Sequence, residues 1–245
     1  MKPFLLLSCR PEDAAAEGER RAVLEFSGLQ DHQLEQMRVE QAPLPIIDLD
    51  NYSGVLLGGG PFNSSDPVKS ELQLRVEADV RRVLEDVFEH DLPFLGLCYG
   101  IGTVTAHMGG VVDRTYGEPA GAVRLRRTDA GHRDPLLLEV PETFHAFVGH
   151  KEAVRELPDG AVLLVEGEAC PVQMFRVQKN CYVTQFHPEL DVDFFIDRMN
   201  IYKHAGYFRP EDLNDLIVRA RQSDVTPAVH TILRRFVEHY ADQSS

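Results

Sequence analysis

The chain has 245 residues, of which 43% are hydrophobic, and its formal net charge at pH 7 is -14. This length and composition suit one large globular domain and exclude a chain that is disordered throughout. The acidic balance argues against a nucleic-acid-binding surface, which needs a basic patch. No run approaches the ~20 apolar residues of a membrane span, and residues 1–8 hold too few apolar residues for a signal peptide. We therefore expect a cytoplasmic protein that contacts neither nucleic acid nor membrane.

The four cysteines have no spacing that indicates a disulfide framework or a zinc site: Cys9, Cys98, Cys170 and Cys181. A chain of this size does not need disulfides for stability, so reduced thiols are expected. The histidines also lack metal-ligand spacing. We predict that the protein requires neither a metal nor a cofactor.

The first half of the chain alternates between strand-like and helix-like patterns. Short apolar runs predict buried strands, and apolar residues that recur every three or four positions predict helices. In chain order we expect a strand at 4–8, a helix at 14–36 with a break near Gly28, strands at 37–40 and 54–57, a helix at 69–89, a strand at 92–97 and a helix at 103–108. Such alternation predicts an α/β fold, in which a mostly parallel sheet has helices on both faces.

The middle of the chain has a different pattern, with strand-like segments separated by turns. They lie at 121–126, 136–138, 144–150, 161–165, 171–177 and 181–186. The last fifty-odd residues have helical periodicity. We expect residues 1–190 to form the α/β domain and residues 191–245 to form a helical extension packed on the same domain.

Cys98 stands where a predicted strand meets a predicted helix, in the sequence Gly96-Leu97-Cys98-Tyr99-Gly100. A sharp turn of this kind lifts its central residue above the sheet, and glycines tolerate the backbone angles that it needs. The helix N-terminus behind Cys98 would favour the reactive thiolate. Taken alone, this spacing fits a catalytic thiol and a buried structural cysteine about equally well.

A second motif, His187-Pro188-Glu189, follows a strand about ninety residues downstream. A thiol nucleophile needs a base that takes its proton and later returns it to a leaving amine, and imidazole suits this task. A carboxylate two residues away can fix the tautomer of the imidazole. The two motifs together predict a triad of Cys98 as nucleophile, His187 as base and acid, and Glu189 as the orienting group.

Acyl transfer also needs donors for an oxyanion. The amide of Tyr99, directly after the nucleophile, is one candidate, and the amide of Gly60 in the glycine loop at 58–61 is the other. Both loops follow predicted parallel strands, whose carboxyl ends are the usual place for ligands. We expect them to share one site.

These three motifs resemble those of the class I (triad) glutamine amidotransferases and are similar to the amidotransferase domain of GMP synthase. The resemblance covers about residues 4–190. It implies a flavodoxin-like fold and the release of ammonia from glutamine through a γ-glutamyl thioester. Residues 149–154 resemble the family segment Ser-His-Gly-Asp-x-Val, which lines the glutamine pocket. The resemblance therefore implies substrate-binding positions at Gly59, Gly102, His150 and Gln185.

The family usually has a glutamine where this chain has Gly102. We therefore expect γ-glutamyl thioester chemistry, while the donor stays open. One interpretation is a glutaminase that passes ammonia to a separate synthase subunit, since no synthase motif is recognised here. The second is a γ-glutamyl hydrolase or peptidase that acts on a small γ-glutamyl compound. The third is a non-catalytic binding or regulatory relative, and a homo-oligomer is compatible with all three.

Overall fold

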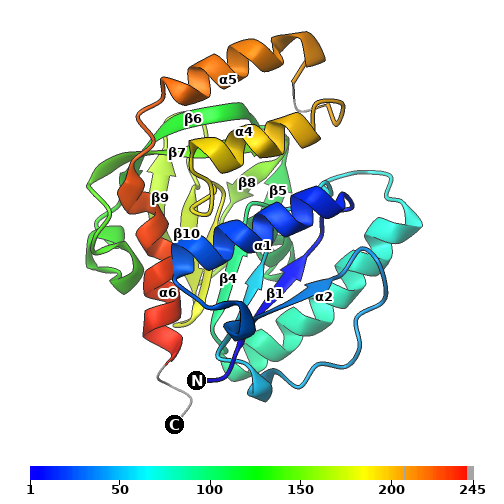
Figure 1. Cartoon of the computed structure of the whole chain (residues 1–245). Coiled ribbons are helices and arrows are strands. Elements are labelled where there is room, and N and C mark those ends of the chain that lie inside the picture. The colour runs from blue at the N-terminus through cyan, green and yellow to red at the C-terminus, as the bar shows by residue number, and fades with distance from the viewer. Residues whose placement is uncertain (207, 242–245) are drawn as a thin grey trace.

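The computed structural model describes residues 1–206 and 208–241, and its centre is a nine-stranded sheet (Figure 1). The strand order is β2-β1-β3-β4-β11-β10-β9-β6-β7. The strands are β1 (Phe4–Ser8), β2 (Leu34–Arg38), β3 (Gly54–Leu57), β4 (Phe94–Leu97), β6 (Glu118–Arg127), β7 (Thr143–His150), β9 (Val162–Gly167), β10 (Met174–Val177) and β11 (Cys181–Thr184). Two short strands that the sequence patterns do not predict, β5 (Val111–Asp113) and β8 (Ala153–Glu156), pair separately.

The sheet has a parallel part and an antiparallel part. The neighbours β2, β1, β3, β4 and β11 run parallel to one another. From β11 onward, β10, β9, β6 and β7 pair in antiparallel fashion. The parallel part holds the strands that alternate with helices in the sequence, and it carries the loops of the candidate site.

Helices cover both faces of the sheet, so the predicted α/β class is confirmed. They are α1 (Asp13–Ser27), α2 (Glu71–His90), α3 (Tyr99–His107), α4 (Val192–Ile201), α5 (Leu213–Arg221) and α6 (Thr231–Ala241). Side chains of β1 alternate between the two faces, as in any strand. Phe4 and Leu6 pack in one core cluster with α1 and α6, while Leu5 and Leu7 pack in a second cluster with α2 and α3.

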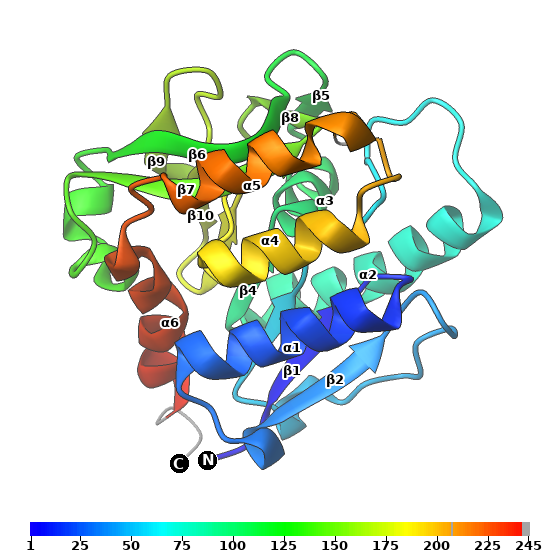
Figure 2. The same ribbon diagram turned by 45° about the horizontal axis from the view of Figure 1, so that its top comes forward.

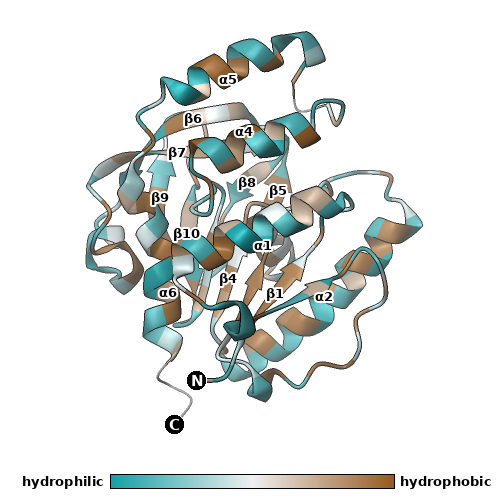
Figure 3. Ribbon diagram, viewed as in Figure 1, coloured by the Kyte–Doolittle hydropathy of each residue, from teal (hydrophilic) through white to brown (hydrophobic). Residues whose placement is uncertain are grey.

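The long helix α2 shows why these sequences form the expected helices. Its apolar residues recur every three or four positions, which Figure 3 shows as alternating brown and teal along the ribbon. The Ser70 hydroxyl accepts a hydrogen bond from the Gln73 amide and caps the N-terminus. The helix ends where Asp91 adopts a left-handed conformation.

Two expected elements differ in the structure. The helix predicted over 14–36 with a break near Gly28 ends at that break and does not resume, because Gly28 adopts φ 77° and donates to the Leu24 carbonyl oxygen, which is a common helix stop. Residues 34–36 belong to β2 instead. The strand predicted at 136–138 is replaced by a 3-10 turn at Pro135–Leu137, in which Leu136 and Leu137 are buried against α6, whereas Leu138 is exposed. Short apolar runs do not by themselves separate strands from turns.

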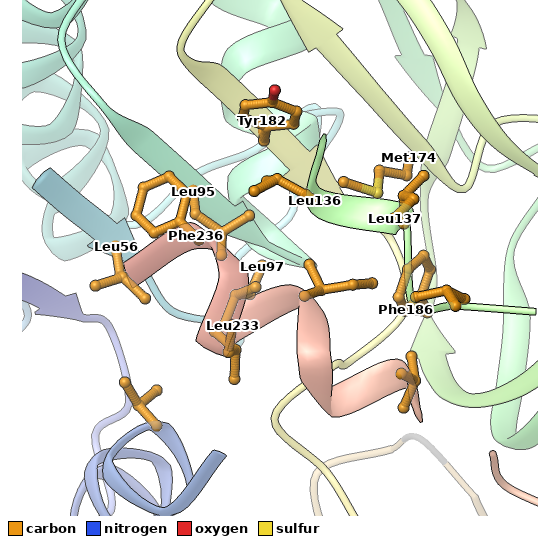
Figure 4. Close-up of a cluster of buried hydrophobic side chains, with 14 of the residues drawn as sticks. Leu56, Leu95, Leu97, Leu136, Leu137, Met174, Tyr182, Phe186, Leu233 and Phe236 are labelled. Atoms are coloured by element: carbon orange, nitrogen blue, oxygen red, sulfur yellow. The ribbon is translucent and has the colours of Figure 1, made fainter. Parts of the chain in front are cut away.

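The C-terminal helices pack on the sheet in two places. Leu233 and Phe236 of α6 share a cluster with Leu56, Leu95 and Leu97 of the parallel strands (Figure 4). Helices α4 and α5 share another cluster with β7, and α4 lies between α1 and α5 (Figure 2). We propose that residues 191–245 extend the domain of residues 1–190, with 207 and 242–245 lying outside the described residues.

Within residues 1–206 and 208–241, no helix is both long enough and apolar enough to cross a membrane.

Candidate active site

The site is built where four neighbouring parallel strands end at one edge of the sheet. Strand β1 is followed by Arg10, β3 by residues 58–60, β4 by Cys98 and β11 by His187. The register pairs Leu7 with Leu57, Leu57 with Gly96, and Thr184 with Leu97, so the ends of these strands lie level with one another. This edge is the usual ligand position in α/β sheets.

Cys98 occupies a strained turn between β4 and α3. Its φ is 52° and its ψ is -86°, and its amide donates to the Thr184 carbonyl oxygen at 2.7 Å. A side chain at Gly96 would place its Cβ 3.0 Å from the Cα of Gly100, so the spacing of the two glycines reflects close packing of strand against helix. Strain of this kind persists where a site needs one side chain held in place.

The strain makes a prediction about stability. Because glycine accepts a positive φ at no steric cost, Cys98→Gly should be more stable than Cys98→Ala by about 1 kcal/mol. Chemical denaturation of both variants measures the difference. The control is Ala106→Gly on the exposed face of α3, which should lose about 1 kcal/mol. Equal stability of the two Cys98 variants would contradict the strain.

His187 is held by Glu189 and Arg198. The Nδ1 of His187 lies 2.7 Å from Oε1 of Glu189, and the same oxygen accepts from Nη1 of Arg198 at 3.0 Å. Glu189 has 0% exposure, and His187 and Arg198 are also buried. The carboxylate therefore fixes the Nδ1 side of the ring, which leaves Nε2 for proton transfer.

The charges of this group shift the pKa values of its members. Burial by itself would lower the pKa of His187, but the charges of Glu189 and Cys98, together with hydrogen bonds to both, raise it to about 9. Burial would raise the pKa of Glu189, but His187 and Arg198 hold it well below the usual range for a carboxyl group. The arrangement thus favours an imidazolium at His187 beside the Glu189 carboxylate.

This shift predicts how stability depends on pH. The folded-state pKa of His187 is raised from 6.5 to about 9, so its stabilising contribution is fully present below pH 6.5 and is lost as the pH rises through 9. The free energy of unfolding should fall across this window, and His187→Gln should flatten the fall. The control is His90→Gln on the exposed end of α2. An unchanged slope in His187→Gln would contradict the assignment.

Two hollows meet at Cys98. The lining of the first includes Gly60, Tyr99, Gly102, His150 and Gln185. The second has His187 in its wall. Gly60, Cys98 and Gly149 line both. The amide of Tyr99 is the first of α3 and, like all first-turn amides, lacks an intrahelical acceptor.

The residues expected to bind substrate have different surroundings. Gly59 lines the second hollow, and its amide donates to Oε1 of Glu19 at 3.1 Å. Both ring nitrogens of His150 have protein partners, so this residue shapes the wall of the first hollow. Nε2 of Gln185 lies 3.9 Å from the Cys98 sulfur, and its Oε1 is buried without a hydrogen-bond partner among residues 1–206 and 208–241.

Glu152 occupies the space beside Gly102. Its two carboxylate oxygens accept from the amides of Ser64 and Ser65 at 2.7 and 2.8 Å. A Cβ at Gly102 would lie 3.0 Å from Oε1 of Glu152, so the missing side chain makes room for this carboxylate. Glu152 lines the first hollow and gives it an acidic group.

The motifs did not identify Arg10 and Glu19 as site residues. Nε of Arg10 donates to Oε1 of Glu19 at 2.7 Å, and Nη1 donates to the Tyr202 hydroxyl oxygen at 3.0 Å. A Cβ at Gly58 would lie 2.4 Å from Oε2 of Glu19, and one at Gly59 would lie 2.4 Å from Nη2 of Arg10. The glycine loop is therefore fitted closely around this buried ion pair.

One buried cluster has metal-ligand chemistry. The ligand atoms of Glu118, His150 and Cys170 lie within 4.8 Å of one another. However, Nδ1 of His150 bonds the Glu152 carbonyl at 2.8 Å, and its Nε2 lies 3.0 Å from Oε2 of Glu118. Burial raises the pKa of Cys170 to about 12, which keeps its thiol protonated. These contacts fit a hydrogen-bonded wall better than a metal site.

Cys98 differs from the other three cysteines in how far it is buried. Cys9, Cys170 and Cys181 are buried, and burial raises the pKa of each. Cys98 is partly exposed, and it is the cysteine that lines both hollows. A reactive thiol must be accessible, so Cys98 is the candidate nucleophile on structural grounds as well.

The chain is similar in sequence to known proteins. The GMP synthase (glutamine-hydrolyzing) of Neisseria meningitidis is 30% identical over 149 residues, which make up 60% of this chain and 26% of that protein. The Bacillus cereus enzyme of the same name is 33% identical over 141 residues, 57% of this chain and 25% of that protein. The chain therefore spans about a quarter of the length of these relatives.

Solved structures share the fold. A glutamine amidotransferase from Thermotoga maritima superposes with a TM-score of 0.78 at 18% identity and covers 99% of both chains. A glutamine amido transferase from Methylobacillus flagellatus gives 0.72 at 19% identity, over 98% of this chain and 96% of that one. The family model for glutamine amidotransferase class-I matches residues 22–193. The chain therefore belongs to the class-I glutamine amidotransferase family.

Proposed function

We propose that the protein hydrolyses a γ-glutamyl amide through a thioester on Cys98, with glutamine as the donor and a separate protein as the acceptor of ammonia. One observation carries the proposal: Cys98, His187 and Gly60 line the same hollow, while Glu189 fixes the far side of the imidazole ring. The glutamine-hydrolyzing names of the relatives support the choice of donor. The raised pKa of His187 supports its role as acid and base.

In the first half of the reaction, the Cys98 sulfur attacks the γ-carbonyl carbon and the carbonyl oxygen becomes an oxyanion. The amides of Gly60 and Tyr99 stabilise this charge. His187 donates its proton to the leaving nitrogen, the carbon–nitrogen bond breaks and the amine departs. A γ-glutamyl thioester on Cys98 remains.

In the second half, water attacks the thioester while His187 takes its proton. The carbon–sulfur bond breaks, glutamate leaves and the thiol is restored. Glu189 and Arg198 keep the ring in one orientation through both halves. The arrangement needs no metal or cofactor for these steps.

The second candidate is a γ-glutamyl hydrolase or peptidase that releases a larger amine. It uses the same three side chains. The hollow beside His187 favours this candidate, because a leaving ammonia molecule does not need a separate hollow. In the lining of the first hollow, Gly102 stands where the family usually has glutamine, and Gly149, Lys151 and Glu152 stand where the family segment has serine, glycine and aspartate.

The test is to incubate the protein with glutamine and with γ-glutamyl dipeptides and to measure glutamate, ammonia and free amino acid. Release of glutamate from any γ-glutamyl amide, abolished when a glutamine-like chloroketone alkylates Cys98, is the expected result. Absence of turnover on every donor, with Cys98 left unlabelled by the chloroketone, would sink the proposal and favour a binding role.

Glu152 gives a prediction about the acyl side. Its carboxylate can attract the α-ammonium group of a γ-glutamyl substrate, so Glu152→Gln should raise KM about tenfold. The glutamine side chain would also place an N–H against one of the two serine amides from which the carboxylate now accepts hydrogen bonds. Steady-state kinetics measure the change, and Glu156→Gln on the exposed end of β8 is the control. An unchanged KM would remove Glu152 from substrate recognition.

A further inference from the structure

A buried network of hydrogen bonds supports the site from behind. It joins Arg10, Glu19 and Tyr202 and ends at the glycine loop of residues 58–60. The match to the family covers residues 22–193, so the three side chains of the network lie outside it. The match therefore assigns the network no role, and the proposed triad does not include it.

Glu19 is the centre of this network. Its Oε1 accepts from Nε of Arg10 at 2.7 Å and from the Gly59 amide at 3.1 Å, and its Oε2 accepts from the Ser8 hydroxyl at 2.8 Å. Nη1 of Arg10 in turn donates to the Tyr202 hydroxyl oxygen at 3.0 Å. Glu19 has 0% exposure and Arg10 has 3%. The bonds therefore lie away from bulk water, where hydrogen bonds to charged groups are strong and well oriented.

Stability alone does not account for a buried ion pair at this place. Taking both charges out of water costs free energy that their mutual attraction offsets only in part, so apolar side chains of similar volume are often as stable or more stable. The carboxylate supplies a fixed acceptor for a backbone amide, which apolar side chains cannot do. The pair is therefore better explained by the loop that it holds than by its own contribution to folding.

The three glycines of the loop differ in what their amides contact. The Gly58 amide donates to the Leu7 carbonyl oxygen at 2.9 Å, and the Gly59 amide donates to Glu19. The Gly60 amide has no acceptor among the residues that the structure describes, and Gly60 lines both hollows. Two amides thus anchor the loop to β1 and α1, and the third is left for an oxygen of the substrate.

Close packing around the network limits how far the loop can shift. A Cβ at Gly58 would lie 2.4 Å from Oε2 of Glu19, and a Cβ at Gly59 would lie 2.4 Å from Nη2 of Arg10. The Cβ position at Gly59 is also 3.5 Å from Cε1 of His187, so the loop lies between the ion pair and the imidazole ring. A shift of the loop by about 1 Å would misplace its third amide, and such errors cost about a hundredfold in rate.

We infer that Glu19, held in place by Arg10, is a positioning residue for the oxyanion hole. Its carboxylate fixes the Gly59 amide, and this sets the next peptide so that the Gly60 amide meets the oxyanion that forms when Cys98 attacks the carbonyl carbon. Glu19 lines neither hollow, so it acts through the loop and does not touch the substrate. The inference rests on the proposed function and adds the residues that organise one of its two oxyanion donors.

Two variants remove the acceptor of the Gly59 amide in different ways. Arg10→Met with Glu19→Leu replaces the ion pair by apolar side chains and leaves no unpaired charge. Glu19→Asp keeps the charge but is one methylene too short to reach both partners, and it carries the test if the double variant does not fold. Because an oxyanion donor acts mainly in the transition state, kcat should fall about a hundredfold in both while KM changes less than about threefold.

Alkylation by iodoacetamide separates positioning from general damage to the site. The Cys98 sulfur displaces iodide in this reaction and no oxyanion forms, so the rate depends on the thiolate and not on the Gly60 amide. Both variants should be alkylated within about threefold of the parent rate, as measured by mass spectrometry. The control is Arg20→Met with Asp31→Asn, which removes a solvent-exposed ion pair between α1 and the turn after it and should change neither rate.

The outcomes that overturn the inference are distinct. A kcat within about threefold of the parent value in either folded variant overturns it. A fall in kcat that the alkylation rate follows in parallel also overturns it, because the network then supports the nucleophile or the fold. A rise in KM alone would assign the network to substrate binding instead. These results leave the proposed function standing, whereas a parent protein that releases glutamate from no γ-glutamyl amide would end both.

Discussion

Replacing Cys98 with alanine should lower kcat for γ-glutamyl amide hydrolysis at least about a thousandfold while the fold is retained. The variant removes the atom that forms the thioester, and no other thiol can replace it, because Cys9, Cys170 and Cys181 are buried. Glutamate release measures the activity, and circular dichroism with thermal unfolding measures the fold.

The matched control is Cys181→Ala, which removes a thiol from the core strand β11. It should lose stability through a small cavity while its kcat stays near that of the parent protein. The nucleophile assignment is refuted if Cys98→Ala turns over substrate at the parent rate.

The second large effect concerns Glu189. Glu189→Gln should lower kcat about a thousandfold or more, because a neutral amide no longer stabilises the imidazolium and does not fix its tautomer. The carboxylate now accepts from both His187 and Arg198. Its loss leaves Arg198 without its charged partner, so the free energy of unfolding must be measured beside the activity.

The pH profile separates this role from a purely structural one. In the parent protein the imidazolium should persist up to about pH 9, so activity falls above that pH. In Glu189→Gln the fall in activity should move to lower pH, because the variant lacks the carboxylate charge that raises the pKa of His187. The control is Asp193→Asn, which removes an exposed carboxylate from the first turn of α4 and should leave the pH profile unchanged. A profile of Glu189→Gln identical to the parent profile would argue against the orienting role.

Sequence reasoning was most successful where local chemistry decides the structure. The turn at Cys98 needs glycines on both sides, so its strand–helix junction is visible in the residues themselves. The motif at residues 187–189 also follows a strand, and parallel pairing of β4 with β11 brings the two turns to one edge. The alternation of strands and helices before residue 110 predicted the parallel strands β1 to β4, whereas their parallel neighbour β11 lies far downstream.

The residues that were missed act through tertiary contacts. Glu19 and Arg198 have no motif around them, although each interrupts the apolar face of its helix, next to buried residues. A charged residue at such a position is the signal that could have indicated a buried ion pair. Arg10 gave no such signal, because its partners lie in α1 and after α4.

Helix ends and short apolar runs were the other weak points. The break expected near Gly28 is where α1 ends, but the apolar spacing after it, expected to continue as helix to residue 36, leads into β2 instead. Leu136 and Leu137 have the composition of a strand, but the preceding proline and the Asp134 side chain, which accepts from the Leu136 amide, fold them into a turn. Both outcomes depend on backbone hydrogen bonds that hydropathy does not encode.

The most direct test of the account is mass spectrometry of the protein quenched with acid during turnover of a γ-glutamyl amide. The account predicts a mass increase of one γ-glutamyl group on the peptide that contains Cys98, and its disappearance once substrate is exhausted. An unmodified Cys98 during turnover, or the same adduct on another residue, would contradict the thioester at the centre of the account.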